Sequence, residues 1–307
     1  MEVGEVKSSS GYGKPPWIFK GSALYQLHLV KAEKARACIP KEFKLVEAFG
    51  YTLGGFFLAS YEDSPVGGFD ELVVISGLVW NRPTSCAWAT RVYVNSDEAC
   101  DHGRKEVGLP SQVARFSKRI TAIPRQRRIR KSGFLDMIGI DTTFQNAKDH
   151  MDVQVTEIKF PGARDMSNVS LTSAAEPALN FDRWMGPVIK MSLPSFSGGT
   201  KYNPNLLKYS CRIECRVRAV EPLIVSGAFP TTNDEELCLQ EHGGSSHTTG
   251  TGDAKDDRQN VSNCVMLSRP ILALKFSQMK MQVEAPLVLY HGSSSLKTSV
   301  SPVTGIP

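Results

Sequence analysis

The residues best suited to chemistry are a glutamate at position 71 and a charged block between positions 91 and 115. A carboxylate can act as a general base, and neighbouring guanidinium groups can hold a developing oxyanion. Either Glu71 or Glu106 could take the role of base, with the arginines as oxyanion holders. The candidate pocket residues are Glu71, Arg91, Arg104, Glu106, Ser111, Gln112 and Arg115.

Other kinds of site have little support in the sequence. It contains no phosphate loop, no dinucleotide-binding glycine motif, no Gly-x-Ser-x-Gly and no His-Glu-x-x-His. None of the 7 cysteines forms a Cys-x-x-Cys pair. Cys211 and Cys215 would lie about 13 Å apart along a strand, too far to share one metal ion. We therefore expect no metal, no cofactor and reduced, buried cysteines.

The elements that must position these residues are mostly strands. Apolar and polar residues alternate strictly from Lys208 to Ala219, which is typical of a long strand with one solvated face. A second long strand is predicted from Ile271 to Val283, where the alternation changes phase near Ser277 and Gln278. A bulge there would bend the strand. The pattern predicts a mainly β fold, with curved antiparallel sheets that close into a barrel.

Shorter elements account for the N-terminal half of the chain. Apolar runs such as Leu72 to Ile75 indicate strands covered on both faces. An Asn95-x-x-Glu98 pattern predicts the cap of one helix. The predicted strands are 51–61, 71–80, 86–94 and 152–160, and the predicted helices are 31–38 and 96–107.

We expect one structured domain over residues 15–290, between a flexible N-terminus (1–14) and a flexible tail (291–307). Within it, 231–263 is rich in acids, Gly, Ser and Thr and is predicted to be a disordered insertion. The first 14 residues lack the features of a secretory or transit peptide, so a cytoplasmic location is expected. The longest stretch without a charged residue, 48–61, is shorter than the roughly 20 residues that span a bilayer.

A strip of basic residues dominates the charge distribution. It has eight cations and no acid within positions 115–131. Because the net charge of the whole chain is +5, the net charge of the remaining residues is −3 (5 minus 8). The strip could bind an anionic membrane surface. Nucleic acid is a less favoured partner, because Pro124 interrupts the basic residues and Phe116 is the single aromatic residue among them. The strip comprises Arg115, Lys118, Arg119, Arg125, Arg127, Arg128, Arg130 and Lys131.

The block from Trp88 to Phe116 resembles the acetoacetate decarboxylase superfamily. The likeness is carried by a strand ending in Tyr93-x-Asn95, a helix with Gly103-Arg104 and a turn ending in Pro110, and by the segments PPWIFKGSALYQL and YEDSPVGGFDEL. It implies a decarboxylase-like cone or barrel with a few short helices, a pocket glutamate at Glu71 and a homo-oligomer. In that family a lysine pair follows the proline: one lysine forms an imine with the substrate, and its neighbour lowers the pKa of that lysine. Here Ser111 and Gln112 stand at those positions, and neither has the primary amine that an imine needs.

The opening segment and GLPSQVARF are similar to a plant branch of that superfamily that is needed for xanthophyll formation, and hence for abscisic acid. This implies an accessory, non-catalytic pocket protein whose partner is a xanthophyll or another lipophilic small molecule, or an enzyme of the carotenoid pathway. Plastid association would follow from that pathway. The alternative is an acid/base isomerase of an epoxycarotenoid.

Overall fold

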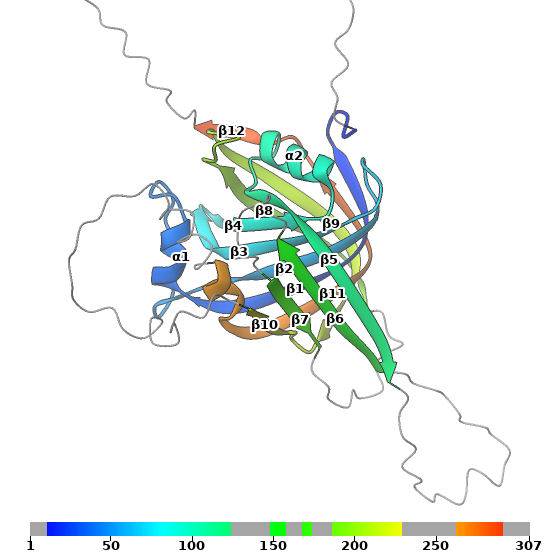
Figure 1. Cartoon of the computed structure of the whole chain (residues 1–307). Helices are drawn as coiled ribbons and strands as arrows, with labels where there is room; N and C mark the ends of the chain where they lie inside the picture. Colours follow the sequence, from blue (N-terminus) through cyan, green and yellow to red (C-terminus); the bar gives the residue numbers. More distant parts are fainter. Residues whose placement is uncertain (1–10, 124–147, 158–167, 174–185, 229–261, 291–307) are drawn as a thin grey trace, which may run out of the picture.

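Seven strands close into a barrel in the order β8-β4-β3-β2-β1-β11-β9, and β9 pairs back with β8 (Figure 1). The computed structural model describes residues 11–123, 148–157, 168–173, 186–228 and 262–290. The mainly β barrel predicted from the period of two is confirmed. The barrel strands are β1 (Trp17–Lys31), β2 (Tyr51–Asp63), β3 (Phe69–Asn81), β4 (Thr84–Val94), β8 (Val188–Gly198), β9 (Leu206–Val220) and β11 (Arg269–Val283).

The two long strands behave as their sequence patterns predict. In β9, Ile213 and Cys215 are buried inside the barrel, while Arg212 and Glu214 are exposed. In β11 the register with β9 shifts between Ser277 and Lys280, and Gln278 has a φ of 51°. The bulge predicted near Ser277 and Gln278 is therefore confirmed, and it bends the strand around the barrel.

A second layer of strands covers part of the barrel's outer surface. It runs β5 (Ser111–Ile123), β6 (Lys148–Glu157), β7 (Asn168–Thr172) and β10 (Ile224–Ala228), and β5 joins it to β4. The pairings are antiparallel as expected except at β4, which pairs in parallel with β5 and β8. The chain crosses over through α2 (Asp97–Lys105) between β4 and β5, as a parallel connection requires. A short β12 (Leu287–Tyr290) pairs with β9.

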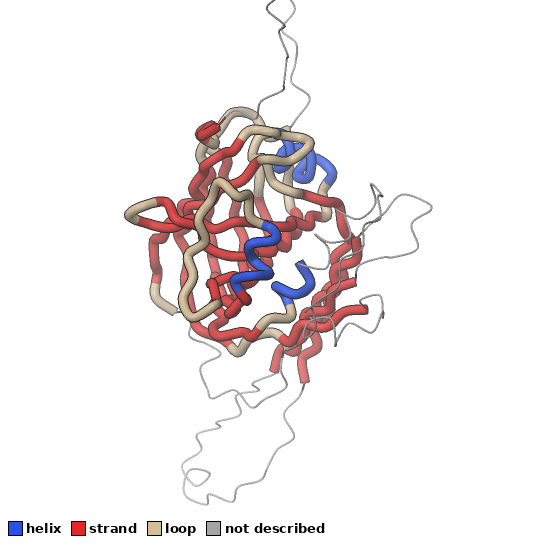
Figure 2. The backbone as a smooth tube through the Cα atoms, turned by 90° about the vertical axis from the view of Figure 1, so that its left-hand side faces the viewer, coloured by secondary structure: helices blue, strands red, loops and turns tan. Residues whose placement is uncertain are grey.

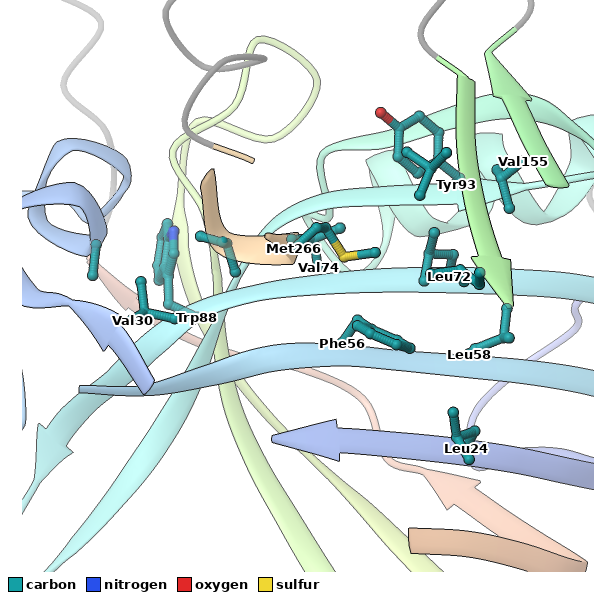
Figure 3. Close-up of a cluster of buried hydrophobic side chains, with 14 of the residues drawn as sticks. Leu24, Val30, Phe56, Leu58, Leu72, Val74, Trp88, Tyr93, Val155 and Met266 are labelled. Carbon is teal, nitrogen blue, oxygen red and sulfur yellow. The ribbon is translucent and has the colours of Figure 1, made fainter. Parts of the chain in front are cut away.

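Alternate residues of the barrel strands pack into two separate cores. Leu24, Phe56, Leu72 and Val74 point outward against the second layer, as Figure 3 shows for the neighbouring strands β1 to β3. The residues between them point into the barrel. The run Leu72 to Ile75 is apolar throughout because β3 is covered on both faces, as predicted.

Helices lie near both ends of the barrel: α1 (Ala32–Cys38) follows β1, and α2 lies near the opposite ends of the strands (Figures 1 and 2). The predicted cap of α2 was wrong by one residue. Ser96 is the cap and accepts a hydrogen bond from the Ala99 N–H at 3.2 Å. The Asn95 side chain instead binds Asp70, both as acceptor from its N–H and as donor to its carboxylate.

The packed body begins earlier than residue 15, because Tyr12 is buried. The predicted insertion lies outside the described residues except for its last two positions, which belong to a short helix at 262–266. The predicted tail, 291–307, also lies outside them. Among the described residues, no helix is long and apolar enough to cross a bilayer.

Candidate active-site cavity

The barrel encloses a cavity of about 380 Å³. It extends from α2, where Trp17 and His102 line it, to the opposite ends of the strands, where Leu53 and Leu78 line it. Most of its described lining side chains are aromatic or aliphatic, and none is a lysine or an arginine. The cavity therefore suits an apolar guest, since an anionic guest would find no cation there.

Glu71 is the acidic group of this cavity. It projects inward from β3, and the Tyr61 hydroxyl donates a hydrogen bond to its Oε2 at 2.8 Å. Burial raises the pKa of Glu71 from its ordinary value of 4.5 to about 7, although the Tyr61 hydrogen bond opposes that shift. At neutral pH the carboxyl is divided between its protonated and ionised forms, so it can either give or take a proton.

Three further groups interact electrostatically with Glu71. Burial, and then the charge of Glu71, raise the pKa of Cys211 to about 12. The same two causes, burial first, raise the pKa of Tyr12. Burial also raises the pKa of Tyr209, with smaller contributions from Cys211 and Glu71. Hydroxyls and a thiol that stay protonated thus surround one titrating carboxyl.

His102 closes the cavity beside α2. Its ring stacks on Tyr12 with centroids 3.6 Å apart and meets the edge of Trp17 at 4.3 Å. Burial lowers the pKa of His102 from 6.5 to about 4, so the imidazole is neutral at physiological pH. Its Nε2 is buried without a hydrogen-bond partner among the described residues.

The two residues at the family's lysine positions point in opposite directions. Ser111 is buried and lines the cavity. Its hydroxyl needs a glycine at position 103, because a Cβ there would lie 2.7 Å from Ser111 Oγ. Gln112 instead accepts a hydrogen bond from Arg91 at 3.2 Å outside the cavity. The alternation of β5 thus presents one of the two positions to a guest.

The remaining sequence candidates do not line the cavity. Arg91 is buried near Glu157, with Nη1 3.8 Å from Oε2. Arg104 donates to the Ser111 carbonyl at 2.8 Å and lies over the Tyr202 ring. Glu106 and Arg115 are exposed. Of the seven candidates, the structure brings Glu71 and Ser111 together in the cavity.

The described part of the basic strip lies on β5. Arg115 and Arg119 are exposed. Lys118 forms an ion pair with Asp70 and donates to Ser60 Oγ at 2.9 Å, so part of its charge is neutralised. The other strip residues, Arg125, Arg127, Arg128, Arg130 and Lys131, lie outside the described residues. Within the described part of the chain, no cluster of His, Cys, Asp and Glu could hold a metal ion.

No protein-family model matches the chain. Among solved structures, it is similar to an acetoacetate decarboxylase-like enzyme from Sphingomonas wittichii RW1, with a TM-score of 0.49, 10% identity and coverage of 94% of this chain and 98% of that one. It is also similar to the enduracididine biosynthesis enzyme MppR complexed with pyruvate, with a TM-score of 0.48, 13% identity and coverage of 94% and 96%.

Curated relatives match over nearly the full chain, and all are named protein neoxanthin-deficient 1. The Arabidopsis thaliana protein is 61% identical over 94% of this chain and 99% of its own length. The Solanum lycopersicum protein is 62% identical over 93% and 96%. The Oryza sativa subsp. japonica protein is 49% identical over 97% of each. Such identity over nearly the whole chain places it in the neoxanthin-deficient 1 family.

Proposed function

We propose that the protein binds the oxygenated end of a xanthophyll in the barrel cavity and thereby supports neoxanthin formation, and through it abscisic acid formation, without forming an imine. The relatives' name supports the pathway. The cavity supports the class of ligand, because its lining is apolar apart from a few neutral hydrogen-bonding groups around Glu71.

The observation that carries this proposal is the absence of any lysine or arginine among the described lining residues. A small keto acid would bring a carboxylate next to Glu71, with no cation to offset the desolvation of either charge. A hydroxyl or epoxide oxygen needs only a hydrogen-bond donor. Protonated Glu71 and the hydroxyls of Tyr12 and Tyr209 can supply one.

The loss of the imine-forming amine agrees with this assignment. Ser111 occupies the one family lysine position that faces the cavity, and serine cannot form an imine. The protein could instead bind an enzyme of the xanthophyll pathway and no free pigment. The binding experiment below separates these two cases.

The test mixes purified protein with violaxanthin, neoxanthin or β-carotene dispersed in detergent and separates bound from free pigment by gel filtration. We expect the two xanthophylls to co-elute with a shifted absorption spectrum and β-carotene, which has no oxygen, to bind more weakly. Glu71→Leu should remove this preference by raising the Kd for the two xanthophylls about fivefold to tenfold, the effect of one lost hydrogen bond. Glu106→Leu, at an exposed position, is the matched control. If no pigment co-elutes with the wild-type protein, ligand binding is wrong.

A second candidate function is the isomerisation of violaxanthin to neoxanthin, favoured by the pKa of Glu71 near 7. Neoxanthin forms when a base removes a proton beside the epoxide, the epoxide C–O bond opens, and the released oxygen takes up a proton, so that no atom is gained or lost. Glu71 would remove the proton and a tyrosine hydroxyl would supply one. Chromatography of violaxanthin incubated with wild-type protein and with Glu71→Gln tests this. Absence of turnover in the wild type would exclude it.

A further inference from the structure

The end of the barrel beside α1 exposes an apolar inner surface. Tyr51, Leu53, Trp80 and Leu272 are 42%, 38%, 40% and 38% exposed. Soluble proteins usually cover residues of this kind when they lie in one patch, and an exposed patch marks a binding surface. At the α2 end the cavity-lining residues Trp17 and Tyr12 are only 4% and 5% exposed, and the exposed apolar residues of the nearby β12, such as Leu287, do not line the cavity.

The strand register shows that this surface is continuous with the cavity. Leu53 both lines the cavity and is exposed at this end. Leu272 pairs with Leu27, which lines the cavity, and paired residues share one face of a sheet. Trp80 lies two residues beyond the lining residue Leu78 on β3. A guest can therefore move along apolar side chains from the cavity to the outside.

Phe49 extends the surface at the tip of a tight turn. Ala48 and Tyr51 exchange two backbone hydrogen bonds of 2.9 and 3.0 Å, so Phe49 and Gly50 form a two-residue hairpin turn. Phe49 has a φ of 53° and is 100% exposed. A bulky residue rarely adopts the left-handed region, and its ring gains nothing from this fold. Asparagine would suit the turn better, so the phenyl ring at this position indicates contact with something outside the molecule.

Charged residues lie beside these aromatic residues. Lys31 pairs with Tyr51, and Arg36 lines a shallow pocket with Tyr51 and Phe49, which Glu33 and Glu47 also line. Arg82 lies over the Trp80 ring, with its guanidinium carbon 5.7 Å from the ring centroid. All three cations are exposed. Tryptophan and tyrosine next to lysine and arginine are the composition that lies at the boundary between lipid headgroups and acyl chains.

We infer that this apolar rim, formed by Phe49, Tyr51, Leu53, Trp80 and Leu272, docks on the surface of a lipid bilayer. Phe49 inserts among the headgroups, and the open end of the barrel then faces the lipid. A lipophilic guest passes between bilayer and cavity without crossing water. The identity of that guest rests on the proposed function, whereas the docking itself does not require it.

Vesicle flotation tests the inference with the full chain. The probes are phosphatidylcholine vesicles with and without 20–30% phosphatidylglycerol (about the anionic range that strengthens binding of basic surfaces). We expect the wild type to float with both and Phe49→Asn to lower the partition coefficient by about tenfold or more, because the buried ring is lost. Phe49→Asn with Trp80→Gln should lower it further. Leu287→Asn is the matched control, since Leu287 is 66% exposed on β12, outside the rim.

Three results would overturn the inference: wild-type protein that stays with neither vesicle, rim variants that float as the wild type does, or rim variants whose main change is loss of a dimer in light scattering. The last result would mean that the rim is an interface between two copies of this chain.

A binding assay with pigment delivered in detergent separates this inference from the proposed function. Phe49→Asn should bind such pigment normally, because Phe49 does not line the cavity.

Discussion

The two ends of the barrel differ in both packing and chemistry. At the α2 end, Tyr12, Trp17 and His102 are buried against one another. Glu71, with its pKa near 7, interacts electrostatically with Tyr12, one of these residues. At the α1 end, the rim from Phe49 to Leu272 is apolar and exposed. The inward-facing positions thus change from a buried, titratable site at the α2 end to an exposed apolar rim at the α1 end.

This difference separates recognition from access. A guest that enters from the α1 end would meet mostly apolar side chains, with Ser85 and Ser195 among them, before its leading end reaches Glu71. The closed end can therefore select the functional group, while the open end accepts any lipophilic remainder. A long molecule with one oxygenated end, the class of ligand proposed above, would satisfy both ends at once.

The largest expected difference between the ends is in stability. Trp17→Ala should lower the free energy of unfolding by about 3–5 kcal/mol, because it empties a packed site. Trp80→Ala should lower it by about 1 kcal/mol or less, since Trp80 is 40% exposed. Urea titration followed by circular dichroism measures both. Equal losses would mean that the rim is part of the core and not an open entrance.

A second comparison uses pH, because Glu71 and His102 have opposite effects on stability. The pKa of Glu71 is raised from 4.5 to about 7, so the folded state holds its proton longer and stability falls as pH rises through that interval. The pKa of His102 is lowered from 6.5 to about 4, so the unfolded state binds the extra proton and stability rises with pH between those values. The two contributions nearly cancel between pH 4.5 and 6.5.

Single variants should reveal each contribution. Relative to the wild type, Glu71→Gln should become more stable by roughly 3 kcal/mol as pH rises from 4.5 to 7. His102→Gln should become relatively less stable by a similar amount between pH 4 and 6.5, since it lacks the rising contribution. Urea titrations at four or five pH values measure both differences. Curves for either variant that run parallel to the wild type would show that its group does not titrate in this interval.

Much of the barrel could be predicted because its strands separate two environments. In β9 and β11 one face meets the interior and the other meets solvent, which forces an apolar residue at every second position. β8 was missed, since Pro194 and several serines interrupt its apolar pattern. The second layer was also largely missed. In β5 the exposed Arg115 and Arg119 obscured the alternation that places Ala114 in the outer core.

The cavity could be predicted only in part. The family resemblance located Glu71 and Ser111, which both line it. Tyr61, Tyr209 and His102 were missed, although the alternation of β9 already assigned Tyr209 to an inward face. Alternation tells which side chains point inward but not which of them meet across the barrel. That depends on strand tilt and register, which arise from pairings between segments far apart in the sequence.

The closed end should support imine formation once a lysine is placed there. Ser111→Lys places an amine in an apolar cavity, where desolvation lowers its pKa and makes it nucleophilic. Incubation with acetone and borohydride should then give one covalent adduct, detected by mass spectrometry. Gln112→Lys is the matched control and should give none, because position 112 faces away from the cavity. Labelling at both positions would contradict the orientation of β5.

The smallest expected effect concerns the basic strip, the other surface that could contact a membrane. Its described members Arg115, Lys118 and Arg119 are all exposed, and Lys118 is paired with Asp70. Each exposed arginine near an anionic surface contributes about 1 kcal/mol at most, and salt screens that contribution. Arg115→Gln with Arg119→Gln should therefore weaken flotation with phosphatidylglycerol vesicles by a few-fold at low salt and leave neutral vesicles unaffected. Phe49→Asn should weaken both. If instead the arginine variant loses binding to neutral vesicles, the strip and not the rim faces the bilayer, and the barrel's open end would then point elsewhere.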